Sequence, residues 1–272
     1  MGWPLAATLL LWWGSTGLIL YLATRGGMGR RAMWPATGLA LLGLAGLLGA
    51  REATTAWSAY CSFTCGLLLW GWIELSYLTG LVTGPKRLQV PCPEHASEAQ
   101  RFLRGIGTSL YHELTVVAVG VLLLLLSRDA PNAVGAWTFA ILWVMRWSAK
   151  LNLFLGVPNL NAEFFPPHLR HLESYIHRRP LNLLFPVSVT VGTFGAAILM
   201  QRAFEQTDPF EAVADLTLGV LLGLAVLEHW FMVVPVRDAD LWRWALPSED
   251  RQATASAAAA GPAAAPAAAQ LR

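Results

Sequence analysis

The chain has 272 residues, of which 55% are hydrophobic and only 13% are charged, and its formal net charge is +2 at pH 7. This composition is typical of a protein that crosses a membrane several times, and it excludes an ordinary soluble globular domain. The small net charge gives no indication of a nucleic-acid partner, and three cysteines are too few for a disulfide-stabilised scaffold.

Seven apolar stretches follow one another along the chain, each close to the roughly 20 residues that a helix needs to cross a bilayer. They predict an all-α membrane bundle with seven transmembrane helices, at about residues 3–23, 33–50, 55–81, 107–126, 133–153, 183–200 and 213–236. Arg146 and Lys150 interrupt the last turns of the fifth stretch. No basic region or clear cleavage site marks the first stretch as a signal peptide, so we expect a retained helix there.

We expect one membrane domain at residues 1–245, followed by a disordered cytoplasmic tail at 246–272 that is mostly alanine and proline. Two connecting segments, 84–106 and 153–181, are long enough to carry structure. In the first, a polar run after Pro91-Cys92-Pro93 predicts an interfacial helix. In the second, the residues before Pro166-Pro167 resist helix, and a short amphipathic helix is predicted from His168 onward.

The basic residues are distributed unevenly between the two sides of the predicted bundle. Sixteen of the nineteen lysines and arginines fall on the side that holds the 84–106 and 153–181 loops and the tail. The other side carries Arg51, Arg128 and Arg202. Because cytoplasmic loops carry an excess of Lys and Arg, the N-terminus is predicted to lie outside and the C-terminus in the cytoplasm.

Ionisable residues inside the predicted helices indicate a site. Such a side chain costs about 2.5–3.5 kcal/mol on insertion scales, so it normally pairs, faces a cavity or binds a ligand. Four of the helices place residues of this kind within a few turns of the cytoplasmic side: Glu74, His112, Glu113, Arg146, Lys150, Glu228 and His229. We expect these helices to converge, so that the seven side chains line a common pocket near the cytoplasmic surface.

Two interpretations of this cluster are open. In the structural one, Arg146 and Lys150 neutralise two of the three glutamates, the third is protonated, and the ion pairs hold the bundle in register. In the functional one, the carboxylates and imidazoles in excess of the two cations bind a metal ion or the central metal of a tetrapyrrole. The candidate metal ligands are His112, Glu113, His168, Glu228 and His229. The Glu-x-x-His spacing of di-iron bundles is absent from the predicted helices.

Several motifs are similar to those of one known family. They are Thr83-Gly84-Pro85-Lys86 with Pro91-Cys92-Pro93, Tyr111-His112-Glu113, the run from Leu227 to Met232, and the unusual block from Arg146 to Tyr175 with Arg179 to Pro186. Through these motifs the chain resembles, over about residues 3–245, the PuhE family of photosynthetic complex assembly proteins of purple bacteria.

The resemblance implies a multi-pass protein of the bacterial inner, photosynthetic membrane that serves bacteriochlorophyll supply or the assembly of the reaction centre and its light-harvesting partners. It supplies no settled catalytic residues. The candidate functional positions within the matching motifs are Glu74, His112, Glu113, Arg146, Lys150, Asn152, Asn159, Asn161, Glu163, His168, Glu228 and His229.

Three functions follow from the residues and the resemblance together. In the first, the protein is a non-enzymatic assembly factor that binds bacteriochlorophyll or a precursor, with His112 or His229 as an axial ligand. Its partners are then the bilayer, reaction-centre or light-harvesting subunits, or pigment-synthesis enzymes. In the second, it is a metal-dependent membrane enzyme of tetrapyrrole or carotenoid metabolism with a bound metal ion, for example a di-iron centre. The third is a transporter, for which the helices lack the expected Gly/Pro breaks.

Overall fold

The computed structural model describes residues 2–25, 27–159, 165–236 and 238–246. Within these residues every regular element is helical, which confirms the predicted all-α class. The α-helices are α1 (Gly2–Ala23), α2 (Gly27–Ala50), α3 (Ala56–Leu78), α4 (Glu98–Gly107), α5 (Leu110–Ser127), α6 (Val134–Leu155), α7 (Leu184–Glu205) and α8 (Pro209–Phe231). Shorter 3₁₀ helices are η1 (Lys86–Leu88), η3 (Pro167–Tyr175) and η4 (Asp238–Trp242).

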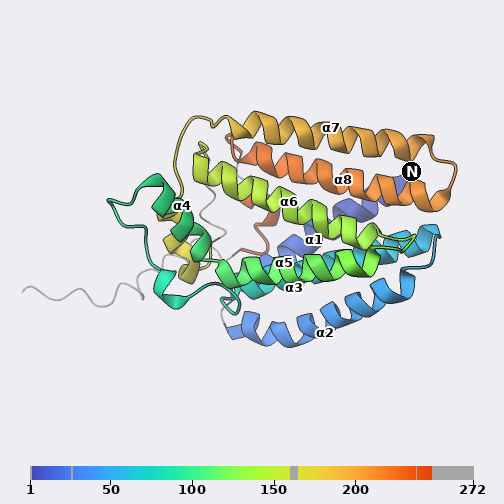
Figure 1. Cartoon of the computed structure of the whole chain (residues 1–272), viewed down its shortest axis with the longest axis horizontal. Coiled ribbons are helices and arrows are strands. Elements are labelled where there is room, and N and C mark those ends of the chain that lie inside the picture. The colour runs from blue at the N-terminus through green and yellow to red at the C-terminus, as the bar shows by residue number, and fades with distance from the viewer. Residues whose placement is uncertain (1, 26, 160–164, 237, 247–272) are drawn as a thin grey trace, which may run out of the picture.

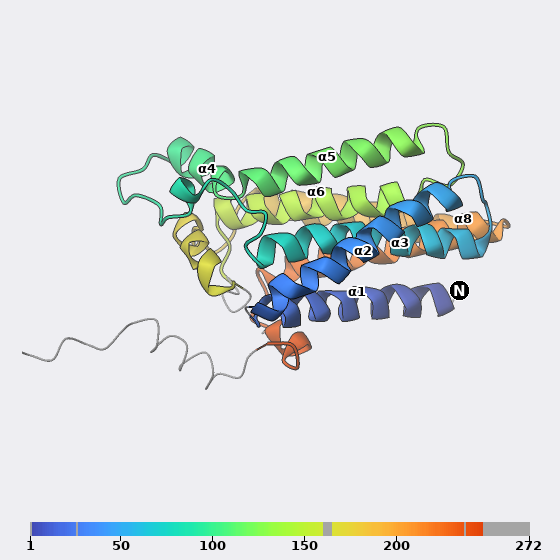
Figure 2. The same ribbon diagram turned by 90° about the horizontal axis from the view of Figure 1, so that it is seen from below.

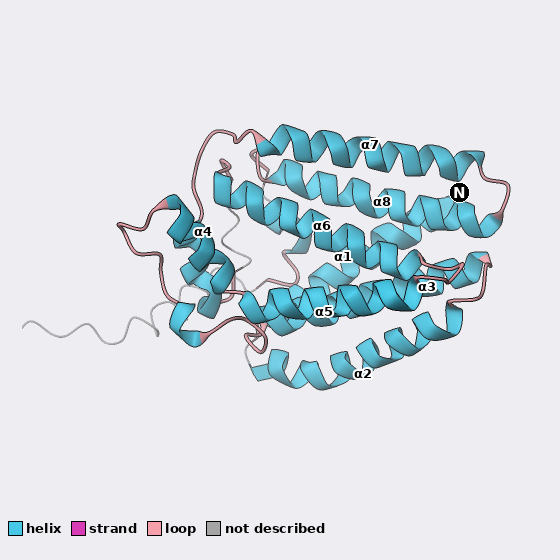
Figure 3. Cartoon of the chain, viewed as in Figure 1, coloured by secondary structure: helices cyan, strands magenta, loops and turns pink. Residues whose placement is uncertain are grey.

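The long helices lie side by side in one bundle, and α4 and η3 lie across one of its ends (Figures 1 and 2). The helices α3 and α8 are central, because α3 contacts α1, α2, α5, α6 and α8, and α8 contacts α1, α3, α6 and α7. Each long helix carries the chain from one end of the bundle to the other (Figure 3). The α1–α2, α3–α5 and α6–α7 connections therefore share the end that α4 and η3 cover, which we call the cap end.

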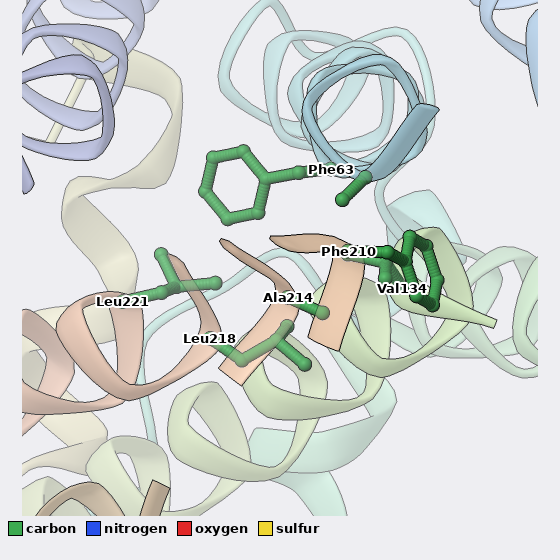
Figure 4. Close-up of a cluster of buried hydrophobic side chains, with 7 residues drawn as sticks. Phe63, Val134, Phe210, Ala214, Leu218 and Leu221 are labelled. Atoms are coloured by element: carbon green, nitrogen blue, oxygen red, sulfur yellow. The ribbon is translucent and has the colours of Figure 1, made fainter. Parts of the chain in front are cut away.

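A compact apolar core holds α3, α6 and α8 together away from the cap end. Figure 4 shows Phe63 of α3, Val134 of α6 and Leu221 of α8 lying in one cluster, with Ala214 and Leu218 between them. Helices in lipid associate through close packing and small residues rather than through the hydrophobic effect. This core therefore fixes how α3 and α6, which carry the site at their other ends, are rotated about their axes.

The outer surface of the bundle suits a bilayer. Among the described residues, six helices are long and apolar enough to cross a membrane by length and composition: α1, α2, α3, α5, α7 and α8. Large apolar side chains are exposed along the peripheral helices, for example Leu124 of α5 and Phe194 of α7. Exposed tryptophans mark both ends of the bundle, Trp3, Trp57 and Trp137 at one end and Trp34, Trp230 and Trp244 at the cap end. Tryptophan favours the two membrane–water interfaces, so this distribution supports a membrane-spanning bundle.

The predicted number of seven spans is supported only in part. The fifth predicted span corresponds to α6, which has 22 residues and runs beside α8 and α3, but it is not among the six helices that qualify by composition. The reason is that Arg146 and Lys150 lower its hydropathy. These two side chains point into the bundle rather than toward lipid, so their polarity is compensated by partners within the protein.

Two helix boundaries differ from the prediction for physical reasons. Helix α2 begins at Gly27 rather than near residue 33, because Arg30 and Arg31 occupy its first turns at the cap end, where long basic side chains can reach water. Helix α3 ends at Leu78, because Gly80 adopts a left-handed conformation with φ of +77° and Leu81 N–H bonds back to the Ser76 carbonyl.

The two connecting segments fold over the cap end. Helix α4 forms inside the predicted 84–106 loop and starts with a capping box between Ser97 and Gln100. The short helix expected after Pro166-Pro167 forms as the 3₁₀ helix η3. The two elements contact each other, and the phenol of Tyr175 donates a 3.0 Å hydrogen bond to the Val90 carbonyl. Burial raises the pKa of Tyr175, so this phenol keeps its proton at neutral pH.

Candidate functional site

A cavity of about 320 Å³ lies beneath the cap, where α3, α5 and α6 approach α4 and η3. Its walls are mostly apolar and aromatic, with side chains from all five elements. Phe102 of α4 and Phe154 of α6 pack edge to face with ring centroids 5.1 Å apart. Leu172 and Tyr175 of η3 and Trp147 of α6 extend this surface. The cavity is therefore a place where a planar or lipophilic molecule could contact aromatic faces.

Two ion pairs line the same cavity. Arg146 of α6 pairs with Glu74 of α3, and Lys150, one turn further along α6, pairs with Glu113 of α5. The exposed fractions are 13% for the Glu74 side chain, 20% for Arg146, 11% for Glu113 and 32% for Lys150, so all four are largely shielded from solvent. The i, i+4 spacing of the cations on one face of α6 was visible in the sequence and brings both pairs to one wall.

These pairs leave hydrogen-bonding capacity unused. The guanidinium of Arg146 reaches Glu74 Oε2 through Nη1, whereas its Nε has no hydrogen-bond partner among the described residues. Glu74 Oε1 is buried and equally without such a partner in the described part of the chain. Ser109 Oγ lies 3.4 Å from Glu113 Oε1 and supports the second pair. Buried polar atoms normally have partners, so the first pair is less completely satisfied than is usual for buried polar groups.

His112 lies next to these pairs but does not line the cavity. Its ring is fully buried and packs against Tyr77, with ring centroids 4.5 Å apart, and Tyr77 is part of the cavity wall. Both ring nitrogens of His112 lack a hydrogen-bond partner among the residues that the structure describes. Glu113 faces the cavity and His112 faces away from it because neighbouring residues in a helix point about 100° apart.

The structure does not bring Glu228 and His229 to the cavity. The indole N–H of Trp12 in α1 donates a 2.9 Å hydrogen bond to Glu228 Oε1. His229 lies at the α6–α8 contact, where its Nδ1 is 2.8 Å from the Ala225 carbonyl and its Nε2 is 2.9 Å from Ser148 Oγ. The expected common pocket of seven residues is therefore wrong in this respect: Glu74, Glu113, Arg146 and Lys150 converge, and the α8 pair lies elsewhere.

Asn152 and Asn159 do not line the cavity either. Asn152 is fully buried and donates to Ser188 Oγ at 3.1 Å, which ties α6 to α7. Asn159 anchors the segment after α6, because its backbone N–H donates to the Met232 carbonyl at 3.0 Å. Asn161 and Glu163 lie outside the described residues.

His168 lies at the cap end beside the end of α3. A Cβ added to Gly80 would lie 3.0 Å from His168 Nε2, so the imidazole packs on this glycine. Burial lowers the pKa of His168, and the positive charges of His171 and Arg30 lower it further, so the ring is neutral at pH 7.

The described residues supply no ligand set for the predicted metal ion. Among them, no group of three His, Cys, Asp or Glu side chains lies close enough together to hold one. The candidates His112 and Glu113 are adjacent in the sequence, as are Glu228 and His229, but the two side chains of each pair point in different directions. His229 already uses both ring nitrogens. His112 packs behind Tyr77 and His229 lies at the α6–α8 contact, so neither is placed for the predicted role of axial ligand to a molecule in the cavity.

Sequence reasoning missed the aromatic wall and one structural asparagine. Phe102, Phe154 and Tyr175 gave no periodic signal, because they lie on α4, at the end of α6 and on a 3₁₀ helix. Asn182 was also missed, although Asn shortly before a helix is a recognisable capping signal. Its Oδ1 accepts from Leu184 N and Phe185 N at 2.9 and 3.0 Å, and its Nδ2 donates to Gly156 O at 2.9 Å.

Replacing Asn182 by alanine should lower the free energy of unfolding by about 1–2 kcal/mol, because it removes the cap of α7 and the link to α6. Unfolding of the detergent-solubilised protein, monitored by circular dichroism, measures this change. Gln201→Ala is the matched control, since that amide bonds only Glu205 one turn away on the exposed face of α7. Equal stability of the two variants would contradict the structural role of Asn182.

Comparison with known proteins gives two matches that span most of the chain. A family model described as "Protein of unknown function (DUF3623)" matches residues 1–253. A relative from Rhodobacter capsulatus, described as "Uncharacterized 30.4 kDa protein in puhA 5'region", is 43% identical over 247 residues, which cover 89% of each chain. No solved structure matches the chain.

Proposed function

The chain belongs to the DUF3623 family, and we propose that it is an integral membrane factor for photosynthetic complex assembly that binds bacteriochlorophyll or a precursor in the cavity beneath the cap. The name of the Rhodobacter capsulatus relative places it in the puhA 5' region, and the PuhE resemblance carries the same puh designation. On this proposal the protein resides in the bacterial inner membrane. Its partners are reaction-centre or light-harvesting subunits, or enzymes of pigment synthesis.

The observation that carries this proposal is the aromatic cavity with two ion pairs in its wall. Small-molecule sites in proteins are mostly apolar, span roughly 300–1,000 Å³ and contain a few polar groups that fix orientation. The cavity volume of about 320 Å³ lies near the lower limit of that range, so the cavity would enclose part of the macrocycle, and the rest of the ring and the hydrocarbon tail would extend outside. Phe102 and Phe154 would contact the ring face, and Arg146 and Lys150 would orient its polar edge.

Among the described residues no histidine lines the cavity, so neither His112 nor His229 is placed to bind the central metal of such a pigment. When bound, the pigment would supply the absorbing macrocycle that the photosynthetic complexes require. The role of the chain itself is to exclude water and to fix the orientation of the ring.

The unequal distribution of basic residues supports an orientation with the cap end in the cytoplasm. The loops and the segment after α8 that carry most of the lysines and arginines share this end of the bundle (Figure 2). On this proposal the N-terminus lies outside, and the cavity opens near the surface where soluble precursors and synthesis enzymes are available. For the alternative of a metal-dependent enzyme, the described residues offer no group of three metal-binding side chains.

Filling the cavity should abolish pigment binding. Ala149 of α6 lines the cavity, so an Ala149→Trp variant purified from a phototrophic host should carry less than about a tenth of the pigment of the unchanged protein, because the indole occupies the space of the ring. Absorption spectra of the purified proteins measure this content. Ala118→Trp, on the exposed face of α5, is the control and should retain the pigment.

Purification from a non-phototrophic host completes the test. The protein should then be colourless and should bind an added chlorin macrocycle with one site per chain. The proposal fails if the protein from the phototrophic host carries no pigment, or if Ala149→Trp retains it in full. Stoichiometric iron without a chromophore would instead support the enzyme alternative.

A further inference from the structure

The charged groups in the cavity wall cancel one another. Among the described residues that line it, the ionisable acids and bases are Glu74, Glu113, Arg146 and Lys150, apart from tyrosine phenols. They form two pairs, so the described part of the wall carries no net charge when all four are ionised. A ligand that brings its own charge into this poorly solvated space would add a charge without a partner, which is costly.

The same wall offers more hydrogen-bond donors than acceptors. Lys150 has three N–H donors and Arg146 has five, and each cation reaches its glutamate through one nitrogen. The serine and threonine hydroxyls of the wall are already engaged, Thr108 with Gly105 O at 2.6 Å and Ser109 with Glu113. A ligand that fits this wall therefore presents acceptors, and these are uncharged oxygens.

We infer that the cavity selects the neutral, carbonyl-bearing form of its macrocycle, in which the acidic side chain is esterified, over the free acid. This inference rests on the proposed function and specifies which form of the pigment the site accepts. Ketone and ester oxygens would accept hydrogen bonds from Arg146 and Lys150 while both cations remain paired with their glutamates. A free carboxylate would have to displace Glu74 or Glu113, or enter a wall with no cation to spare.

A matched pair of ligands tests the inference directly. Pheophorbide a and its methyl ester share one metal-free macrocycle and differ in the charge of one side chain. Titrated at mildly alkaline pH into the detergent-solubilised full-length protein, the ester should bind about tenfold or more tightly than the acid. Quenching of tryptophan fluorescence reports binding, because Trp147 lines the cavity. Equal binding of the two, or a preference for the acid, overturns the inference.

Changing the charge of the wall should change the preference. In Glu74→Gln the amide oxygen can still accept from Arg146, whose guanidinium cannot lose its charge, so the wall gains one positive charge. The preference for the ester should fall about tenfold or reverse. The double variant Glu74→Gln with Arg146→Met restores neutrality and should restore the preference. Glu52→Gln, at an exposed pair with Arg51, is the control and should leave the preference unchanged.

The possible results separate the two proposals. If neither macrocycle binds, the cavity is not a pigment site and the proposed function fails. If both bind but Glu74→Gln does not alter their ratio, pigment binding stands and charge selection is wrong. Displacement of the ester by a short-chain quinone at equal concentration would assign the cavity to neutral carbonyl compounds without a macrocycle, and this also overturns the inference.

Discussion

Replacing Arg146 by methionine is expected to lower the free energy of unfolding by about 3–5 kcal/mol, because it leaves the shielded carboxylate of Glu74 without its cation. Most of this loss comes from leaving the Glu74 carboxylate shielded without a cation. The net stabilisation that the ion pair itself contributes to folding is the smaller part. The double variant Arg146→Met with Glu74→Gln should therefore recover most of the stability. Titration of the folded protein from a mild detergent into dodecyl sulfate, followed by circular dichroism, measures these differences.

The exposed pair of Arg51 and Glu52 supplies the control for this prediction. Its side chains are 38% and 69% exposed, so Arg51→Met should change the free energy of unfolding by about 1 kcal/mol or less. The interpretation of the Arg146 pair is wrong if Arg146→Met is as mild as Arg51→Met. It is also wrong if the double variant is less stable than either single variant.

The four converging charges could be predicted because their chemistry demands partners. Arg146 and Lys150 share a helix face, and an ionisable group in a bilayer needs compensation, so carboxylates at a similar depth were the natural partners. The rise per residue gave the depth of Glu74 and Glu113 along their helices. Depth and charge together indicated three candidate carboxylates, Glu74, Glu113 and Glu228, and the structure shows that the first two are the partners.

The prediction that Glu228 and His229 line the pocket is wrong because it used only their position along the helix. That position does not determine the direction in which a side chain points around the helix axis. Both lie at the expected level of α8, but α8 contacts four helices and is buried nearly all round, so its sequence has no polar face to set its orientation. The orientation of α8 about its own axis is set by the packing of Phe210, Ala214 and Leu218, and the sequence does not reveal this packing.

The cavity itself was beyond sequence reasoning for a related reason. It exists because α4 and η3 fold over the end of the bundle, and neither segment has the length or period that predicts a tertiary position. The predicted seven spans and the six helices that qualify by composition differ at α6. The two cations in α6 are compensated inside the bundle, and a hydropathy measure counts them as if they faced lipid.

A single methyl group at the contact between α3 and α6 is expected to destabilise the whole bundle. A Cβ at Gly66 would lie 2.7 Å from the Gly135 carbonyl oxygen, and a Cβ at Gly135 would lie 2.7 Å from the Ser62 carbonyl oxygen. These partners are backbone atoms and cannot rotate away, so the helices must separate. Gly66→Ala should lower the free energy of unfolding by about 1–3 kcal/mol, and Gly135→Ala should act in the same direction.

The effect should also reach the cavity, because α3 carries Glu74 and α6 carries Arg146. Helices pushed apart at Gly66 weaken this ion pair and loosen the wall that holds the ring, so pigment content should fall together with stability. Gly49→Ala is the matched control, since no atom lies within 4 Å of an added Cβ there and alanine favours helix by about 0.5–1 kcal/mol. That variant should be as stable as the unchanged protein or more so, and should keep its pigment. If Gly66→Ala behaves like Gly49→Ala, then α3 and α6 are not in close contact, and the geometry proposed for the site does not hold.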